Sequence, residues 1–393
     1  LHHRLREMEY APGDRIGVLS NNDPLQVQLL LALSLLGATI VPLKSDLTFH
    51  ELEMQITDAR CQHLFVQDGL TARFPEGASC TTFSQLQANP IPVKFEDSRS
   101  RTLLLQHPLA IFYTSGTTGS PKGAVLPYRT FLYSAMPNAL NLRVHRADLW
   151  LACLPLDHIG GFSIVTRSLI YGTSIYLQKK FDAETTLQIL QEVPITIVSL
   201  VPTMLKRLLD QGLEAKSVNL RAILLGGARP DAELVSRALE RGLPLIRSYG
   251  MTETCSQVVA TPYHMTHKNP ESSGKPLGFT QIRIVNADGK DLKRGETGEI
   301  LIKSPTVMNE YWNNAESTAK IIDKDGWFLT SDFGYLDDDD NLYTVSRREN
   351  LIVTGGENVI PEEVESALNS HVSIRSSCVF GVEDPEWGEK VVA

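Results

Sequence analysis

The sequence has 393 residues, of which 42% are hydrophobic and 21% charged, and its formal net charge is −9. This length allows a large core and more than one domain. A general nucleic-acid or acidic-membrane binder needs a basic face, so the acidic balance disfavours both classes. The five cysteines are odd in number, widely spaced and without a Cys-x-x-Cys pair. This usage predicts a reduced, cytoplasmic protein with no structural zinc site.

An apolar run near the N-terminus, Leu25 to Leu43, raises the question of a membrane span. Gln, Ser, Gly and Pro residues interrupt it, Asn22–Pro24 supplies a helix start, and Gly37 supplies a helix stop. A span needs ~20 nearly uninterrupted apolar residues. We therefore expect a buried helix over Leu25–Leu36, then a strand over Ala38–Leu43, and no stable insertion into a membrane.

Short apolar runs alternate with helix-compatible segments through the first part of the chain. This alternation is typical of an α/β fold with mostly parallel sheets flanked by helices. The expected strands are Arg15–Leu19, Ala38–Leu43, His63–Val66, Leu109–Tyr113, Ser174–Leu177, Ile195–Leu200, Ala222–Leu225 and Leu245–Ser248, and the expected helices include Leu25–Leu36, Leu47–Ala59 and Asp231–Glu240.

The pattern changes after about residue 280, where short strands are separated by Asp-Gly and Gly-Glu-Thr-Gly turns. This predicts a small antiparallel, barrel-like region that contains strands Gln281–Val285, Glu299–Ile302 and Leu342–Val345. The run Asp337–Asp340 is interpreted as a solvated hairpin turn rather than a calcium loop, since no ligand-spaced sequence follows it.

A charged run near residue 347 suggests a boundary between two domains. We predict a large N-terminal domain over residues 1–347 and the start of a small α+β domain over residues 348–393.

A glycine- and hydroxyl-rich loop, Tyr113-Thr-Ser-Gly-Thr-Thr-Gly-Ser-Pro-Lys-Gly123, follows the expected strand Leu109–Tyr113. Its glycines allow close backbone approach, its hydroxyls can donate hydrogen bonds, and Lys122 adds a positive charge, so the loop suits a polyphosphate. It is not a Walker loop, because Pro121 precedes the lysine and glycine follows it. Composition alone leaves a flexible surface turn equally open.

This loop closely resembles the signature of the adenylate-forming enzymes, which comprise acyl-CoA synthetases, amino-acid adenylation domains and luciferases. Further segments match in the family's order, and the resemblance covers essentially the whole chain. It implies that a carboxylic acid attacks ATP to give an acyl-adenylate, and that coenzyme A then displaces AMP. The further segments are Leu224–Ala228, Ser248–Thr254, Thr330–Gly334, Ser346–Ile352 and Gly355–Glu363.

The resemblance implies a set of nucleotide-binding residues. The loop would hold the outer phosphates, the glycine pair after strand Ala222–Leu225 would lie against the adenine, Tyr249 would stack on it, and Asp332 would bind the ribose. The full set is Thr114, Ser115, Gly116, Thr117, Thr118, Gly119, Lys122, Gly226, Gly227, Ala228, Tyr249, Gly250, Met251, Thr252, Asp332 and Arg347.

The resemblance also implies the catalytic and metal-binding groups. Lys122 and Glu253 would act at the phosphates, with Glu253 and Thr118 as ligands of Mg²⁺, a cation that prefers oxygen donors. His158 would orient the reacting carboxylate of the acid. A local pattern cannot distinguish this role from that of a structural histidine in a loop, and Asp332 could equally be a helix cap.

The remaining family features lie near the C-terminal end. Glu349 matches the hinge position, although the Glu-Asn pair found here departs from the more usual residues, and Gly355, Gly356, Glu357 and Asn358 would line the coenzyme A tunnel. The sequence starts without Met and ends partway into an expected strand. We therefore expect a fragment that lacks the family's catalytic lysine and adenylates poorly.

Within the family, the segments Ser134–Leu142, His158–Ser163, Ile170–Thr173 and Tyr249–Gln257 resemble the 2-succinylbenzoate–CoA ligases of menaquinone biosynthesis. Such an acid needs a pocket with apolar walls and a few polar donors. The candidate pocket residues are His158, Ser199, Thr203 and Ser256.

Several alternatives stay open at this point. Another aryl or medium-chain acyl-CoA synthetase would share these motifs, and a catalytically inactive nucleotide-binding regulator could keep the same fold. The expected partners are a small carboxylic acid, ATP and coenzyme A, with no nucleic acid and with a homo-oligomer as one option.

Overall fold

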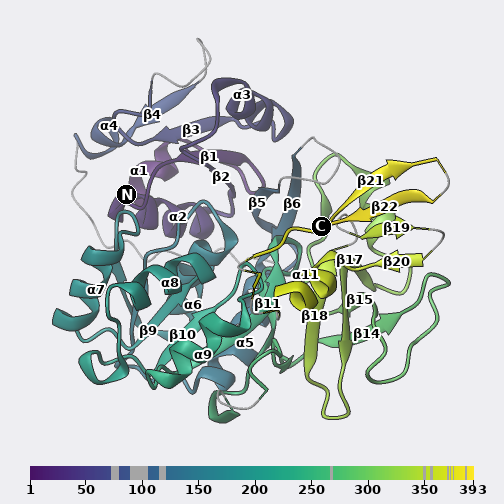
Figure 1. Cartoon of the computed structure of the whole chain (residues 1–393). Coiled ribbons are helices and arrows are strands. Elements are labelled where there is room, and N and C mark those ends of the chain that lie inside the picture. The colour runs from purple at the N-terminus through teal and green to yellow at the C-terminus, as the bar shows by residue number, and fades with distance from the viewer. Residues whose placement is uncertain are drawn as a thin grey trace.

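The computed structural model describes residues 1–71, 79–88, 105–114, 121–265, 269–347, 351–354, 357–369, 371, 373–374, 376–385 and 387–393. Within these ranges, the strands form two seven-stranded sheets and two four-stranded sheets. Figure 1 shows the N-terminal sheet at the top, the second large sheet with its helices below it, and the antiparallel strands to the right.

The first large sheet is parallel over five strands and antiparallel at one edge. Its strand order is β16-β6-β5-β2-β1-β3-β4, and β6 and β16 are the antiparallel strands. The strands are β1 (Arg15–Leu19), β2 (Thr39–Leu43), β3 (His63–Val66), β4 (Cys80–Thr82), β5 (Pro108–Thr114), β6 (Lys122–Pro127) and β16 (Glu310–Tyr311), and the helices are α1 (His2–Glu7), α2 (Pro24–Leu36), α3 (Phe49–Asp58) and α4 (Phe83–Gln87).

The second large sheet repeats this plan, with the order β13-β12-β11-β10-β9-β7-β8 and antiparallel strands β12 and β13 at one edge. Its strands are β7 (Leu149–Ala152), β8 (Ser174–Leu177), β9 (Ile197–Leu200), β10 (Ala222–Leu225), β11 (Leu245–Met251), β12 (Ser256–Ala260) and β13 (Lys275–Pro276). The helices are α5 (Tyr128–Leu142), α6 (Ile159–Tyr171), α7 (Ala183–Glu192), α8 (Pro202–Asp210) and α9 (Ala232–Glu240), with short 3₁₀ turns η2 (Ala215–Ser217), η3 (Thr252–Thr254) and η4 (Tyr263–Met265).

Both four-stranded sheets are antiparallel where their pairing is described. The first has the order β14-β15-β17-β18 and the second β20-β19-β22-β21. Their strands are β14 (Gln281–Val285), β15 (Gly298–Lys303), β17 (Phe328–Leu336), β18 (Leu342–Arg347), β19 (Ile352–Thr354), β20 (Glu357–Val359), β21 (Phe380–Asp384) and β22 (Gly388–Val392), with helices α10 (Ala315–Ile321) and α11 (Pro361–Asn369).

The predicted α/β class is confirmed, and the central strands show why the sequence reveals it. All residues of β2, β3, β9 and β10 are buried, as expected for parallel strands covered by helices on both faces. Such strands are continuous apolar runs, which explains the close agreement with the expected bounds. The antiparallel region after residue 280 is also confirmed.

The apolar run from Leu25 is helix α2 followed by β2. Asp23 caps the helix by accepting a hydrogen bond from the backbone N–H of Leu25, and Gly37 ends it with a φ of 77°. Leu29 and Leu33 are fully buried in the core of the first sheet. Among the described residues, none of the helices has the length and apolar character needed to cross a membrane.

The acidic run Asp337–Asp340 is a hairpin turn between β17 and β18, as predicted. The Asp337 carboxylate accepts hydrogen bonds from the backbone N–H groups of Asp339 and Asn341, which is how aspartate commonly stabilises a turn. The predicted domain boundary lies between β18 and β19, which belong to different sheets. The division into two domains stays a prediction.

Candidate active site

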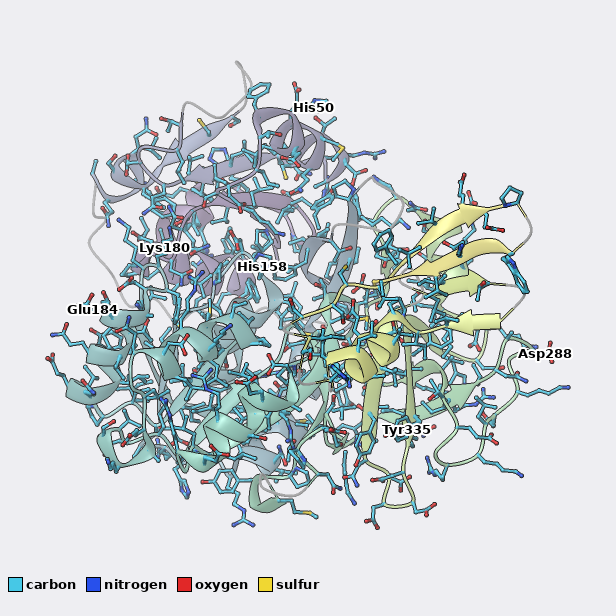
Figure 2. The ribbon with its side chains drawn as sticks, in the orientation of Figure 1. His50, His158, Lys180, Glu184, Asp288 and Tyr335 are labelled. Carbon is cyan, nitrogen blue, oxygen red and sulfur yellow. The ribbon has the colours of Figure 1, made fainter. Side chains whose placement is uncertain are left out.

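A cavity of about 890 Å³ lies where the carboxyl ends of strands from both large sheets meet. Its wall includes residues at the end of β5, β9 and β11 and residues directly after β2, β7 and β10. Ligands of open α/β sheets bind at this end of the strands. Figure 2 shows His158 near the middle of the molecule, between the two sheets, whereas Glu184 and Asp288 lie toward the outer edges.

One side of the cavity is formed largely by backbone. Gly226 and Gly227 follow β10, and a Cβ added to Gly226 would lie 2.6 Å from the Ser248 hydroxyl oxygen. A Cβ on Gly250 would lie 2.1 Å from the carbonyl oxygen of Ser256. Gly226 and Gly250 therefore cannot carry a side chain, and a planar ring can pack against their backbone.

The next part of the wall carries opposite charges. Glu253, in η3, is 9% exposed and accepts a hydrogen bond of 2.7 Å from the Tyr311 hydroxyl. The Lys122 Nζ atom lies 5.4 Å from the centroid of the Tyr311 ring. Burial, together with the neighbouring Glu253 carboxylate, raises the pKa of Tyr311 far above its ordinary value. The tyrosine therefore keeps its proton and acts as a donor.

The antiparallel sheet contributes a buried carboxylate. Asp332 is 7% exposed, and its Oδ2 atom accepts a hydrogen bond of 2.8 Å from the Tyr249 hydroxyl. Along β17 and β18, Asp332 and Arg347 are direct register partners. Two residues from different sequence motifs thus come to the same point of one sheet.

Another part of the cavity wall is built on α6. His158 is the N-cap residue of this helix, and its side chain is exposed to the cavity. Its Nε2 atom lies 3.9 Å from the Asp157 Oδ1 atom. Partial desolvation in the cavity wall and the Lys44 ammonium lower the pKa of His158, while burial raises the pKa of Asp157 to about 6. A neutral imidazole is therefore the expected state at pH 7.

A buried arginine lies on the same helix. Arg167 of α6 lines the cavity, is 3% exposed, and donates a hydrogen bond of 2.8 Å from Nη2 to the Ser134 hydroxyl. Its buried Nε has no hydrogen-bond partner among the described residues. Burial lowers the pKa of this guanidinium. A desolvated cation at the wall of a cavity creates a strong preference for an anionic ligand.

The sequence profile of the AMP-binding enzyme family matches residues 1–312. The chain belongs to this family. The 2-succinylbenzoate–CoA ligase of Geobacillus kaustophilus is 38% identical over 389 residues, which span 98% of this chain and 78% of that protein.

Solved structures agree with this AMP-binding family membership. The o-succinylbenzoate CoA synthetase of Bacillus subtilis, solved in complex with its acyl-adenylate intermediate, superposes with a TM-score of 0.89 at 34% identity and covers 99% of this chain and 80% of that chain. The same protein in complex with ATP and magnesium gives a TM-score of 0.87 at 33% identity, over 99% of this chain and 81% of that chain. The predicted resemblance is therefore confirmed.

In this AMP-binding enzyme, the cavity wall brings together many of the residues expected from the sequence. They are Thr114, Lys122, His158, Ser199, Gly226, Gly227, Gly250, Met251, Thr252, Glu253, Ser256 and Asp332. Tyr249 is half-buried next to this wall and reaches the site through its bond to Asp332. Their roles toward substrates stay predictions.

Other expected residues lie elsewhere. Ala228 is exposed beyond the glycine pair, and Thr203 is exposed on α8, where Val201 and Met204 form the cavity wall instead. For Arg347, Glu357 and Asn358, only the backbone in β18 and β20 is described. The expected site residues that lie outside the described part of the chain are Ser115, Gly116, Thr117, Thr118, Gly119, Glu349, Gly355 and Gly356.

The cavity wall also carries groups that the sequence did not suggest, among them Arg167 and Tyr311. A charged residue inside an otherwise apolar helical segment, Ile159–Tyr171, is unusual enough to signal Arg167. Tyr311 has no comparable signal, because tyrosine at the end of a short strand most often serves packing alone. Only its contacts with Glu253 and Lys122 identify it.

Proposed function

We propose that this chain is an ATP-dependent acid–CoA ligase whose acid is 2-succinylbenzoate. Family membership and the names of the relatives support an AMP-forming acid–thiol ligase. The observation that carries the choice of acid is Arg167, a buried guanidinium on the cavity wall. An acid with two carboxylates can bind this cation through one of them, while the other carboxylate stays free to react.

The proposed reaction has two steps. A carboxylate oxygen of the acid attacks the α-phosphorus of ATP, and the bond from that phosphorus to the oxygen of pyrophosphate breaks. The sulfur of coenzyme A then attacks the acyl carbon and loses its thiol proton, and the bond from that carbon to the oxygen of AMP breaks. A carboxylate is already a nucleophile, so positioning and charge neutralisation are the main tasks of the protein.

The nucleotide side of the cavity fits the first step. Lys122 would neutralise charge on the outgoing pyrophosphate, Thr252 would contact the α-phosphate, and Asp332 would accept hydrogen bonds from the ribose. The glycine backbone after β10 would pack against the adenine. These assignments follow from family resemblance and from the positions of the residues on one cavity wall.

The donor set also fits Mg²⁺. This cation is usually held by one or two carboxylates together with the phosphates of a substrate rather than by an all-protein cage. Glu253 supplies one nearly buried carboxylate on the cavity wall, and Thr118 is the second proposed ligand. Bound there, Mg²⁺ would neutralise phosphate charge.

The acid side fits a planar substrate with polar ends. His158 would orient the reacting carboxylate, and Arg167 would bind the other one. The Ser199 hydroxyl accepts a hydrogen bond of 3.2 Å from the Trp150 indole N–H, so it is fixed near the carboxyl end of β9. Apolar contacts from Leu200, Val201 and Met204 complete this wall. Coenzyme A would be the second substrate.

The proposal is tested by acid selectivity. Pyrophosphate release by the full-length protein is measured with 2-succinylbenzoate, benzoate, octanoate and amino acids, and 2-succinylbenzoate is expected to give the highest kcat/KM. In Arg167→Met, kcat/KM for 2-succinylbenzoate should fall about 100-fold, because breaking a buried ion pair costs about 3 kcal/mol. The values for the monocarboxylic acids should change little.

Arg247 offers a matched control. It is also an arginine with 3% exposure, but it lies outside the wall of the large cavity. Arg247→Met should therefore reduce stability without changing the order of preferred acids. A clear preference of the wild type for octanoate or benzoate would refute the assignment of 2-succinylbenzoate and favour another acyl-CoA synthetase. A failure to release pyrophosphate with every acid would favour the inactive regulator.

A further inference from the structure

Tyr311 lies between the two charged groups of the nucleotide side. Its strand, β16, pairs with β6 so that Tyr311 is opposite Ala124, two residues after Lys122. The backbone N–H of the next residue, Trp312, donates a hydrogen bond of 2.7 Å to the carbonyl of Gly123. The two-residue strand is thereby fixed beside the start of β6.

The tyrosine itself is anchored at both ends. Its backbone N–H donates a hydrogen bond of 2.9 Å to the Thr318 hydroxyl, and its side chain is 9% exposed. Its hydroxyl donates a hydrogen bond of 2.7 Å to the Glu253 Oε1 atom. The main chain of Glu253 is held separately, because its carbonyl accepts a hydrogen bond of 2.8 Å from the backbone N–H of Met308.

The ring has a second contact. The Lys122 ammonium lies 5.4 Å from its centroid, within the range of a cation–π interaction. One side chain thus touches a buried carboxylate with its hydroxyl and a lysine with its ring. Neither contact resembles simple core packing, because both act on charged groups of the cavity wall.

We infer that Tyr311 is a positioning residue that orients the Glu253 carboxylate for a divalent cation and holds Lys122 beside the phosphate site. The inference rests on the proposed roles of Glu253 and Lys122. The hydroxyl occupies one carboxylate oxygen and leaves the other available to the cation. A neutral donor suits this task, since a charged one would compete with the metal for the carboxylate.

Two substitutions separate the two contacts. Tyr311→Phe removes the hydroxyl and keeps the ring, whereas Tyr311→Leu removes both. Binding of Mg²⁺ in the presence of a non-hydrolysable ATP analogue is measured by calorimetry. Tyr311→Phe should weaken Mg²⁺ binding about tenfold, as expected for loss of a hydrogen bond to a charged group. Its affinity for the metal-free nucleotide should be unchanged.

Tyr311→Leu should add a loss of affinity for the metal-free nucleotide of about threefold, the size of an exposed cation–π contact. This additional loss should disappear when Lys122 is replaced by Met. Tyr128→Phe is the matched control, because its hydroxyl donates a hydrogen bond to the carbonyl of Ser34 far from the phosphate side. It should leave Mg²⁺ and nucleotide binding unchanged.

Glu253→Gln and the double variant decide whether Tyr311 acts through Glu253. Glu253→Gln should weaken Mg²⁺ binding, and adding Tyr311→Phe should then have no further effect, because the two residues form one unit. Two outcomes would overturn the inference about Tyr311 but not the proposed metal role of Glu253. One is an additive loss of Mg²⁺ affinity in the double variant. The other is normal Mg²⁺ binding by a folded Tyr311→Phe variant while Glu253→Gln loses it. Normal Mg²⁺ binding by Glu253→Gln would overturn the proposed metal role of Glu253 as well.

Discussion

The two sides of the cavity are built in different ways. On the side proposed for the nucleotide, the groups come from short sequence motifs in which neighbouring residues line the same cavity wall, as in the segment that contains Gly250 and Glu253. On the side proposed for the acid, single residues come from separate places in the sequence, such as His158 at the N-cap of α6, Arg167 within that helix and Ser199 in β9. Residues that bind a ligand shared by the whole family can thus form a contiguous motif, whereas residues that select a particular acid are brought together by the packing of helices.

The largest expected effect is on the nucleotide side. Replacing Lys122 by Ala removes the cation proposed to stabilise the outgoing pyrophosphate, so ATP–pyrophosphate exchange should fall about 100- to 1,000-fold. The affinity for the acid should be nearly unchanged. Lys44→Ala is the matched variant, because Lys44 also lines the cavity but lies near Asp157 and His158. Equal losses of exchange in the two variants would contradict the division into two sides.

Asp157, on the acid side, should make stability depend on pH. Its carboxyl has an ordinary pKa of 3.8, but in the folded protein burial keeps it protonated up to a pKa of about 6. Between these values the folded state binds more protons than the unfolded state, so stability falls as the pH rises through this window. Asp157→Asn should therefore be about 2–3 kcal/mol more stable than wild type at pH 8 and similar to it near pH 3.5.

Urea denaturation at several pH values checks this. Asp148 is a matched control, because it is also buried but forms an ion pair with Arg221. Burial tends to raise the pKa of Asp148, and hydrogen bonds from Arg221, His145 and Thr196 lower it overall. Asp148→Asn should therefore destabilise the protein at pH 8. If Asp157→Asn and Asp148→Asn both stabilise the protein at pH 8, the stabilisation does not come from the raised pKa of Asp157.

The third expected effect concerns Ser134, which accepts a hydrogen bond from Arg167. The Ser134 hydroxyl accepts from Arg167 and donates a hydrogen bond of 3.1 Å to the carbonyl of Cys255. Ser134→Ala leaves both buried groups without this partner, so we expect a loss of about 1–3 kcal/mol in the free energy of unfolding. The KM for 2-succinylbenzoate should rise more than that for benzoate.

Ser34→Ala serves as the control for this experiment, because its hydroxyl bonds only to the carbonyl of Leu31 within α2 among the contacts described. It should change neither KM value. An equal rise in KM for both acids in Ser134→Ala would show that Ser134 supports the general fold of the pocket rather than Arg167.

The smallest effect is expected at Thr203, which the sequence suggested as a pocket residue. Because Thr203 is exposed and outside the cavity wall, Thr203→Ala should change stability by less than about 0.5 kcal/mol and the acid KM by less than about twofold. Met204→Ala, at the adjacent wall position, should raise the acid KM measurably. The reverse order of effects would place the acid on the other side of α8.

The α/β class, most strand positions and the motifs proposed to bind the nucleotide could be predicted from the sequence alone. Buried parallel strands are continuous apolar runs, and a loop that approaches a phosphate closely needs glycine. Both features can therefore be recognised from a few neighbouring residues. The run around Lys122 and the segment with Glu253 could be interpreted without knowing where either lies in space.

The contacts of Arg167 and Tyr311, in contrast, could be found only in the tertiary structure. Arg167 meets Ser134 from another helix, 33 residues away, and Tyr311 meets Glu253 across 58 residues. Contacts of this kind depend on the packing of distant elements and leave no periodic or compositional pattern. The same reason separates Thr203 from Met204, since one residue along a helix turns a side chain from the cavity to solvent.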